Sequence, residues 1–226
     1  MALTKIEFAV QMTCDSCERD VRNSLDNVDG VKNIEIDLKS GSVVVDTTLS
    51  ADEVFKKLEQ SGKKVVLKGY GNLSGVVILD TGKKSVKGVV RFVQQTPNIC
   101  IIDGTVDGLN PGKHQISVHE CGDLSEGCSS VGSYFNPYTN GSRSVYGNIG
   151  CVNAESNGRA AFRIDDNVIK LSEIIGRSFV ISDEKNNRLA CGIIARSAGL
   201  FQNPKKICAC DGISLWDEKS QPKPSL

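Results

Sequence analysis

Histidine is scarce in this 226-residue chain, which contains only His114 and His119. Two imidazoles cannot build a metal site that needs three or more histidine ligands, so histidine-rich metal centres are excluded. Net charge is also missing, because 27 basic residues balance 27 acidic residues. We therefore expect neither nucleic acid nor an anionic membrane surface as a partner.

Long apolar runs are absent as well. No stretch approaches the roughly 20 apolar residues that span a bilayer, and the residues after Met1 lack the apolar core of a signal peptide. We therefore expect a cytoplasmic protein that does not insert into a membrane. In that reducing compartment, the nine cysteines suit ligand, redox or buried roles better than a disulfide framework.

The first informative cysteine spacing is Cys14-Asp15-Ser16-Cys17. Two thiolates at this spacing can hold one soft cation, and a two-sulfur site suits monovalent copper while leaving room for a recipient's sulfur. A redox dithiol, half of a zinc site and two buried thiols are alternatives that the spacing leaves open. The flanking sequence must decide among them.

Residues 1–70 alternate between strand-like and helix-like patterns. Residues 3–10 alternate as a half-buried strand, and a helix is predicted from Ser16, with apolar positions at Cys17, Val21, Leu25 and Val28. Two strands, a second helix and a closing strand follow at residues 31–38, 42–48, 51–60 and 63–68. The order βαββαβ predicts an α+β ferredoxin-like domain with the two cysteines at its first helix, whose N-terminus favours thiolate.

The stretch Met12-Thr13-Cys14-Asp15-Ser16-Cys17 resembles the signature of heavy-metal-associated domains, which occur in copper chaperones and copper ATPases. The resemblance covers residues 1–70. It implies that Cys14 and Cys17 bind Cu(I), supplied by a copper donor protein or transporter, with Lys63 or Lys64 near the metal. We also expect Thr13 to help cap the following helix.

Residues 71–200 show a different pattern after a glycine-rich break at residues 69–72. Short apolar runs separated by glycine and polar turns predict an all-β sandwich or barrel. Several segments resemble Cu/Zn superoxide dismutase, and the resemblance implies its Greek-key fold. The segments are 107–114, 118–123, 127–130, 134–137 and 187–192.

The metal ligands of that family are largely missing here. Its dinuclear site needs six histidines and an aspartate, and only His119 stands at a copper-ligand position. Other residues occupy the remaining positions that we can align: Ser117, Tyr134, Ser182 and Asn148. We therefore expect neither dismutase activity nor zinc in this domain. His114 and Arg188, which match a structural histidine and a substrate-guiding arginine, are interpreted as structural.

The remaining cysteines of this domain fall into two groups. Cys128 and Cys191 stand at the positions of the family's intrasubunit disulfide, so the resemblance implies a bond between them, with two reduced buried thiols as the alternative. Cys100, Cys121 and Cys151 have no role in the family, and we expect them to pack as small hydrophobic residues.

The surface that pairs dismutase subunits is also recognisable in the sequence. The matching positions are Gly122, Asp123, Ile175, Gly176, Arg177 and Ile194. A sandwich that keeps its pairing surface but loses its ligands is predicted to imitate a dismutase subunit. The expected partner is a Cu/Zn superoxide dismutase bound as a heterodimer, and a homodimer through the same face is the alternative.

Residues 201–226 form a polar tail that contains Cys208-Ala209-Cys210 and is expected to be flexible. In an extended chain the two sulfurs point to the same side, so they can chelate copper or bond to each other. A disulfide across one intervening residue is easily reduced and can pass oxidising equivalents to a partner's cysteine. This pair resembles the third domain of the copper chaperones for superoxide dismutase.

The combined resemblance implies a copper chaperone in which Cys14 and Cys17 load Cu(I), the sandwich docks, and Cys208 and Cys210 carry out copper transfer and thiol–disulfide exchange. It also implies a smaller pool in the mitochondrial intermembrane space. Two alternatives stay open at this point. One is a divergent superoxide dismutase, and the other is a protein whose four sulfurs hold structural zinc or buffer copper.

Overall fold

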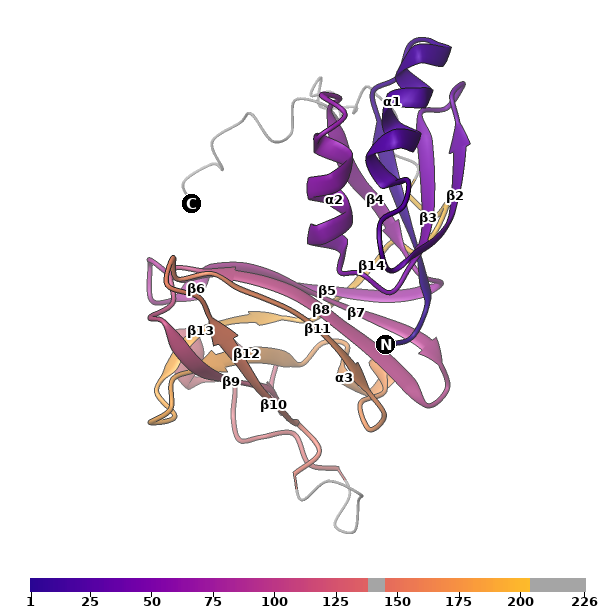
Figure 1. Ribbon diagram of the computed structural model, residues 1–226. Helices are drawn as coiled ribbons and strands as arrows, with labels where there is room; N and C mark the ends of the chain where they lie inside the picture. Colours follow the sequence, from indigo (N-terminus) through magenta and orange to yellow (C-terminus); the bar gives the residue numbers. More distant parts are fainter. Residues whose placement is uncertain (138–144, 204–226) are drawn as a thin grey trace. The chain divides into compact units, whose positions relative to one another are not determined.

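The computed structural model describes residues 1–137 and 145–203, which form two compact units (Figure 1). The N-terminal unit contains Leu3–Tyr70 together with residues 198–203, and the described part of the sandwich unit comprises Met1–Ala2, residues 71–137 and residues 145–197. Among the described residues, no helix is long and apolar enough to cross a membrane. Cys208 and Cys210 lie outside the described residues.

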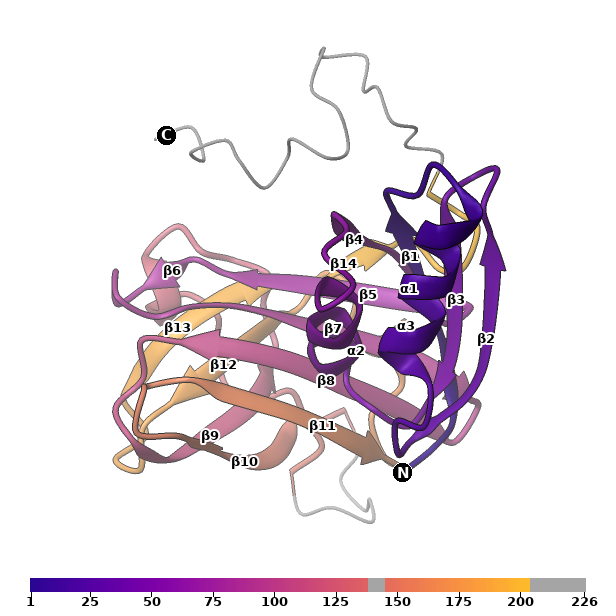
Figure 2. The same cartoon turned by 45° about the horizontal axis from the view of Figure 1, so that its top comes forward.

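The N-terminal unit has the predicted βαββαβ order. Its four strands form one antiparallel sheet in the order β2-β3-β1-β4, and α1 is visible in front of that sheet in Figure 2. The fully buried Ile6, Phe8 and Val10 share one face of β1, because side chains alternate along a strand. The elements are β1 Thr4–Val10, α1 Asp15–Leu25, β2 Val31–Asp37, β3 Ser42–Thr47, α2 Ala51–Glu59 and β4 Val65–Tyr70.

The two helices of this unit begin in different ways. Ser50 and Glu53 form a reciprocal capping box at α2, whereas α1 begins after an extended Cys14 that makes no side-chain capping bond. The expectation that Thr13 caps α1 is therefore wrong. Its hydroxyl Oγ1 instead lies 3.8 Å from the Cys17 sulfur. The predicted helix also ends earlier than Val28, since α1 stops at Leu25 and Asn27 has a positive φ.

The sandwich unit consists of two antiparallel five-stranded sheets, in the orders β10-β9-β12-β13-β6 and β11-β8-β7-β5-β14. This arrangement confirms the predicted all-β sandwich, and its core includes Phe92 and Phe179 in an edge-to-face contact. The strands are β5 Leu73–Leu79, β6 Thr81–Gly82, β7 Lys87–Thr96, β8 Ile99–Asp107, β9 Gly112–His119, β10 Asn148–Ala154, β11 Ala160–Asp166, β12 Ser178–Ser182, β13 Arg188–Ile193 and β14 Ala195–Ser197. The short helices are η1 Gly127–Ser129 and α3 Leu171–Ile174.

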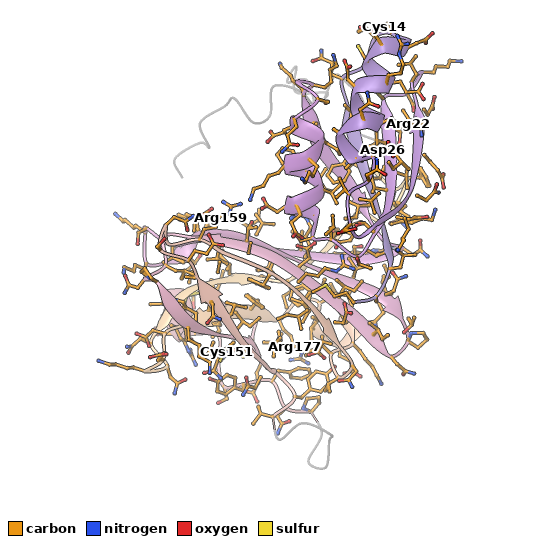
Figure 3. The ribbon with its side chains drawn as sticks, viewed as in Figure 1. Cys14, Arg22, Asp26, Cys151, Arg159 and Arg177 are labelled. Carbon is orange, nitrogen blue, oxygen red and sulfur yellow. A yellow bond between two sulfur atoms is a disulfide. The ribbon has the colours of Figure 1, made fainter. Side chains whose placement is uncertain are left out.

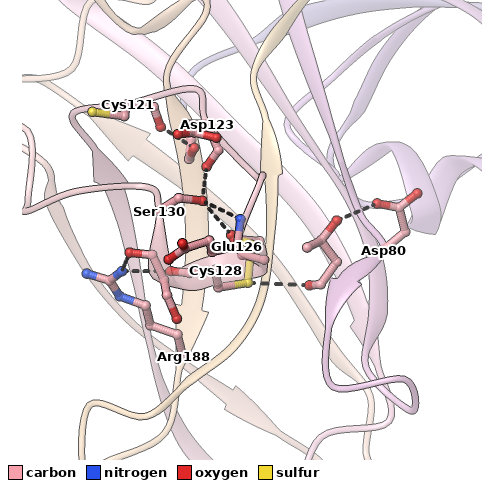
Figure 4. Close-up of a disulfide and its surroundings, with 12 residues drawn as sticks. Asp80, Cys121, Asp123, Glu126, Cys128, Ser130 and Arg188 are labelled. Carbon is pink, nitrogen blue, oxygen red and sulfur yellow. Dashed lines mark hydrogen bonds between the residues drawn. A yellow bond between two sulfur atoms is a disulfide. The ribbon is translucent and has the colours of Figure 1, made fainter.

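A disulfide joins Cys128 of η1 to Cys191 of β13 (Figure 4). These are the two cysteines that the dismutase resemblance pairs. Around them, Val131 and Val180 form a small buried cluster. The bond closes a loop of 63 residues and ties the irregular segment after β9 to the sheet.

The three remaining cysteines of this unit do not share one environment. Cys100 is fully buried, and burial raises the pKa of its thiol to about 12, so it packs as a small hydrophobic residue as predicted. For Cys121 and Cys151 the same prediction is wrong, because both are exposed. Cys121 lies in the loop after β9, and Cys151 is on the edge strand β10, where alternation turns Val152 inward instead.

Candidate metal centre

Cys14 and Cys17 lie together where the loop after β1 enters α1, and Figure 3 labels Cys14 at that end of the helix. Their sulfurs are 3.3 Å apart, and both cysteines are free thiols. The backbone sets this spacing, because the carbonyl of Cys14 accepts the amides of Cys17 and Glu18. The first turn of the helix therefore brings two sulfur ligands to one point.

The two thiols differ in exposure. Cys14 is exposed, whereas Cys17 retains 8% of its accessible surface. The hydroxyl of Ser16 lies 3.0 Å from the Cys14 sulfur, a contact that the sequence pattern did not indicate. An incoming sulfur can thus reach Cys14 first, while Cys17 is held against the unit.

The environment of Cys17 favours its thiolate form. Hydrogen bonding from the Thr13 backbone, then from the Cys14 and Thr13 side chains, lowers the pKa of the Cys17 thiol to about 6. Thiolate is the metal-binding form of cysteine, so at neutral pH Cys17 is ready to bind a soft cation. Thr13 therefore acts on the sulfur rather than on the helix end.

Lys63 is the lysine that responds to this site. The negative charge on Cys17 raises the pKa of Lys63, and the Lys63 ammonium Nζ lies 3.4 Å from Asp20 Oδ2. Asp20 was missed in the sequence, although it lies one helical turn after Cys17 and helical spacing could have indicated it. A cation bound between Cys14 and Cys17 would therefore contact the Cys17 thiolate and have the Lys63 ammonium nearby.

Within residues 1–137 and 145–203, no group of three or more histidine, cysteine or acidic side chains is arranged to hold a metal ion. Cys14 and Cys17 are therefore a two-sulfur site in this part of the chain. Two soft ligands match the low coordination number of monovalent copper better than the four ligands typical of structural zinc.

The dismutase-like copper position carries a histidine whose ring nitrogens are both engaged. Nδ1 of His119 lies 3.0 Å from the Gly132 carbonyl, so Nδ1 carries the proton and donates it. Nε2 then accepts from the Ser117 hydroxyl at 3.1 Å, and the His119 ring packs against Tyr134. Burial lowers the pKa of His119, so the neutral form is favoured. A neutral imidazole with both nitrogens bonded presents no free lone pair to a metal.

The other replaced positions are filled by ordinary structural contacts. Ser182 is buried in β12 opposite Gln115 of β9, and the Gln115 amide donates to Asn148 Oδ1. Arg188 donates to the carbonyls of Cys128 and Gly132, as Figure 4 shows in part. These contacts explain how the sheet keeps its shape with serine and asparagine in the place of ligands.

His114 is buried, and its Nε2 lies 2.8 Å from the Asn110 carbonyl. This contact fits the structural role expected for it. The histidine holds the turn before β9 through this contact.

The residues expected to bind a partner gather near the loop after β9 and the end of α3. Ile175 is 40% exposed, and Gly122 lies so close to Gly176 that a β-carbon at Gly122 would stand 2.0 Å from the Gly176 carbonyl oxygen. Ile194 is fully buried, so its side chain does not reach the surface, whereas Ile193 is 40% exposed and lies beside Gly122. The sequence resemblance assigned the exposed position to Ile194, whereas the exposed residue is its neighbour Ile193. We call Gly122, Ile175, Gly176 and Ile193 the glycine–isoleucine face.

Two polar residues expected on this surface are engaged within their own unit. The Arg177 guanidinium stacks 3.5 Å from the centre of the Phe135 ring and donates to the carbonyls of Glu120 and Glu173. Figure 3 labels Arg177 in the sandwich unit. Asp123 accepts the amide of Ser125. Arg177 and Asp123 thus shape the face, while its apolar surface comes from the isoleucines.

Comparison with protein families agrees with this division. Residues 7–64 match the heavy-metal-associated domain, and residues 86–194 match copper/zinc superoxide dismutase (SODC). Because the second match includes the unit whose ligands are replaced, it identifies the fold and not the activity.

Curated relatives match over nearly the whole chain. A human copper chaperone for superoxide dismutase is 46% identical over 97% of this chain and 90% of its own length. The superoxide dismutase 1 copper chaperone of Saccharomyces cerevisiae is 30% identical over 94% of this chain and 92% of its own length. These relatives have the names of chaperones and not of dismutases. The chain belongs to the copper chaperones for superoxide dismutase.

Proposed function

We propose that this protein carries Cu(I) on Cys14 and Cys17, docks on a Cu/Zn superoxide dismutase and completes the activation of that enzyme. One observation supports the proposal above all others. A paired thiol site with a low-pKa sulfur is joined to a dismutase fold whose own ligand positions hold serine, tyrosine and asparagine. The chain can therefore carry copper but has no dismutase site of its own to receive it.

Loading takes place at Cys14 and Cys17. Copper enters from a donor protein or transporter by exchange between neighbouring thiolates, so that no free ion is released. The exposed sulfur of Cys14 exchanges first, and the Cys17 thiolate retains the ion until a recipient sulfur arrives.

Docking uses the glycine–isoleucine face. Ile175 and Ile193 supply exposed apolar area, and the close approach of Gly122 to Gly176 keeps the backbone there free of side chains. A dismutase subunit that offers its own pairing surface would form a heterodimer in place of its homodimer. In the absence of dismutase, the same face would support a homodimer of the chaperone.

Completion is assigned to Cys208 and Cys210. With these two cysteines joined as a disulfide, a thiolate of the target attacks one sulfur and forms a mixed disulfide between the proteins. A second target thiolate then displaces the chaperone sulfur. The target gains its intrasubunit disulfide, and Cys208 and Cys210 leave as a reduced dithiol that has accepted two electrons.

We place this activity in the cytoplasm, with a smaller pool in the mitochondrial intermembrane space. Zinc is not part of the proposal for the dismutase-like domain, because His119 is bonded on both nitrogens.

Reconstitution of copper-free, disulfide-reduced dismutase with this protein, in the presence of a copper chelator, tests the proposal. Cys208→Ser combined with Cys210→Ser is expected to abolish activation while the complex still forms. Cys14→Ser combined with Cys17→Ser is expected to impair activation mainly when copper is scarce. Cys151→Ser, which removes an exposed cysteine of the sandwich unit, serves as the matched control and should activate like the parent.

Three results would contradict the proposal. Activation by both double variants at the parental level would remove the cysteine roles. Dismutase activity of the purified, copper-loaded chain without a partner would favour the divergent enzyme instead. A chain that binds copper or zinc tightly but never activates dismutase would identify a buffering or structural metal protein.

A further inference from the structure

Glu7 is a fully buried carboxylate on the side of the sheet away from the cluster of Ile6, Phe8 and Val10. It lies in the middle of β1, where a solvent-facing position would ordinarily leave a glutamate exposed. A buried carboxylate is costly unless its oxygens accept hydrogen bonds or pair with a cation. The partners of Glu7 therefore show what its burial achieves.

One carboxylate oxygen is used within the sheet. Oε1 lies 3.0 Å from the Lys68 ammonium of β4 and 3.4 Å from the Ser42 hydroxyl of β3. These contacts join the two strands that flank β1 and compensate the buried charge.

The other oxygen bonds to a residue 194 positions later in the chain. Oε2 of Glu7 accepts the backbone amide of Phe201 at 2.7 Å, a charge-assisted bond of the stronger kind. The Phe201 side chain is 70% exposed, so the backbone and not the ring makes this connection. The carboxylate thus holds the main chain that leads to the C-terminal cysteines.

The residues around Phe201 have contacts and a backbone conformation that hold its amide against Glu7. The Gly199 carbonyl lies against Gly69 of β4, where a β-carbon would stand 2.5 Å from that oxygen, so only glycine allows the approach. Gln202 closes a turn onto Gly199 through both its amide and its side chain. Phe201 at φ 59° has the left-handed backbone conformation that non-glycine residues adopt rarely.

A further bond extends the contact along β4. The Asn203 side chain donates to the Lys68 carbonyl at 3.4 Å. Because β4 is an edge strand of its sheet, the returning segment covers part of an edge that would otherwise present unpaired backbone groups. We call Glu7 with its bond to Phe201 the Glu7 clip.

We propose that Glu7 is a positioning residue, which fixes the start of the C-terminal segment on the N-terminal unit so that Cys208 and Cys210 stay within a short chain of Cys14 and Cys17. This inference rests on the proposed function of these cysteines. Cys210 follows Asn203 by seven residues, a chain that can span at most about 25 Å. Glu7 precedes the end of β1 by three residues, or about 10 Å, so the tethered sulfurs can reach the loop after β1.

The clip acts through effective concentration. A chain held at Asn203 keeps its cysteines in a smaller volume than one released at the end of β14, and shorter tethers raise the rate of intramolecular exchange. Breaking the clip should therefore lower sulfur-to-sulfur exchange between the tail and the loading site without changing either pair of sulfurs.

The test uses the full chain with Cys17 and Cys210 as the reporting pair. Cys14, Cys121, Cys151 and Cys208 are changed to serine, and a glutathione buffer of known ratio supplies the oxidant. The measured quantity is the effective concentration of the Cys17–Cys210 disulfide. Phe201→Pro removes the amide and forbids the positive φ, whereas Phe201→Gly keeps the amide and tolerates that φ. Both lose the same side chain, so they form a matched pair that leaves the sheet untouched.

We expect Phe201→Pro to lower the effective concentration about two- to threefold or more, because the free tether to Cys210 lengthens from seven residues after Asn203 to 13 residues after Ser197. Phe201→Gly should match the parent. Glu7→Leu should reproduce the loss seen with Phe201→Pro, and its Phe201 amide should exchange with solvent faster than in the parent. Equal effective concentrations in the proline and glycine variants would overturn the proposal. No dismutase is present, so this result and the failure of activation by the proposed function can be told apart.

Discussion

Cys17 of the N-terminal unit and His119 of the sandwich unit belong to side-chain types that bind copper, yet their surroundings differ in one decisive respect. Hydrogen bonds to Cys17 stabilise its charged, metal-binding form and lower its pKa to about 6. The hydrogen bonds to His119 consume both of its nitrogens. Family membership alone would assign a ligand role to both residues. The hydrogen bonds of each residue show which one can still bind a metal: the Cys17 thiolate can, and the His119 nitrogens are already occupied.

The same contrast extends to the surfaces of the two units. The metal site of the N-terminal unit leaves Cys14 open for exchange. In the sandwich unit Ser117, His119 and Ser182, which stand at dismutase-like ligand positions, are buried. Its exposed side chains include those of Ile175 and Ile193. The N-terminal unit therefore exposes a metal-binding thiol, whereas the sandwich unit exposes apolar side chains suited to binding a partner.

The largest expected effect is the loss of Cu(I) affinity when the sulfurs of Cys14 and Cys17 are removed. In a chain that already carries Cys208→Ser and Cys210→Ser, Cys14→Ser with Cys17→Ser should lower Cu(I) affinity more than about 100-fold, beyond what outer-shell changes produce. Competition with a chromophoric Cu(I) chelator measures this affinity. In the same background His119→Ala is the control and should leave it unchanged. A comparable loss with His119→Ala would break the comparison.

The next effect is a loss of stability that should be confined to the sandwich unit. Cys128→Ser with Cys191→Ser removes the cross-link of the sandwich unit and should lower its free energy of unfolding by about 2–5 kcal/mol. Urea unfolding followed by amide exchange reports each unit separately. Amides of β1 and β3 should keep their protection. If they lost it to the same extent, the two units would not unfold independently.

A third prediction sharpens the difference between neighbouring isoleucines. Ile194→Ala should lower the stability of the sandwich unit by about 2–4 kcal/mol, because a fully buried side chain leaves a cavity. Ile193→Ala should leave stability nearly unchanged but weaken dismutase binding, since its side chain is 40% exposed beside Gly122. Chemical unfolding and titration calorimetry measure the two quantities. The reverse pattern would place Ile194 on the docking surface.

The smallest effect concerns the acidity of Cys17. Its alkylation rate should follow the thiolate fraction and fall as the pH drops through about 6. Thr13→Val should raise this pKa by less than about one unit, since the side-chain bond is lost and the larger backbone contribution stays. Thiolate absorbance against pH gives the value. A lowered pKa in Thr13→Val would contradict the assigned cause.

The sign of the pH dependence follows from the same comparison. A thiol whose pKa is lowered by folding stabilises the folded state above its unfolded pKa, near 9, and loses that contribution as the pH falls through about 6. The pKa of His119 is also lowered, by burial, so its contribution to stability is present above the ordinary histidine pKa of 6.5 and is lost on acidification. Both units should therefore become less stable in acid, for different reasons.

Local pattern was sufficient for much of this molecule. Strand alternation and helical spacing predicted the βαββαβ unit, since those periods record which side of an element is buried. Short apolar runs between turns predicted the sandwich. The pairing of Cys128 with Cys191 required the family resemblance, because cysteine spacing alone allows many pairings.

Features that depend on a single step of alternation, or on distant chain contacts, were harder to predict. Ile193 and Ile194 are adjacent and chemically identical, and only the register of β13 decides which one is exposed. The contact between Glu7 and Phe201 joins positions 194 residues apart and uses a backbone amide, which leaves no signature in residue type. Exposure of Cys121 and Cys151 likewise depends on where a loop and an edge strand turn.

The two-sided bonding of His119 has a consequence for reversibility. Placing histidines at positions 117, 134 and 182 would supply imidazoles but would also remove the Ser117 hydroxyl that bonds Nε2 and the Tyr134 ring that packs on His119. Arg188 would still be directed at the carbonyls of Cys128 and Gly132. Building a metal centre at His119 would therefore require several coordinated changes, because the histidines added at positions 117 and 134 each remove a contact that holds the present packing. The loss of the metal site in this unit is therefore a matter of rearranged hydrogen bonds and ring packing around His119 as well as of missing ligands.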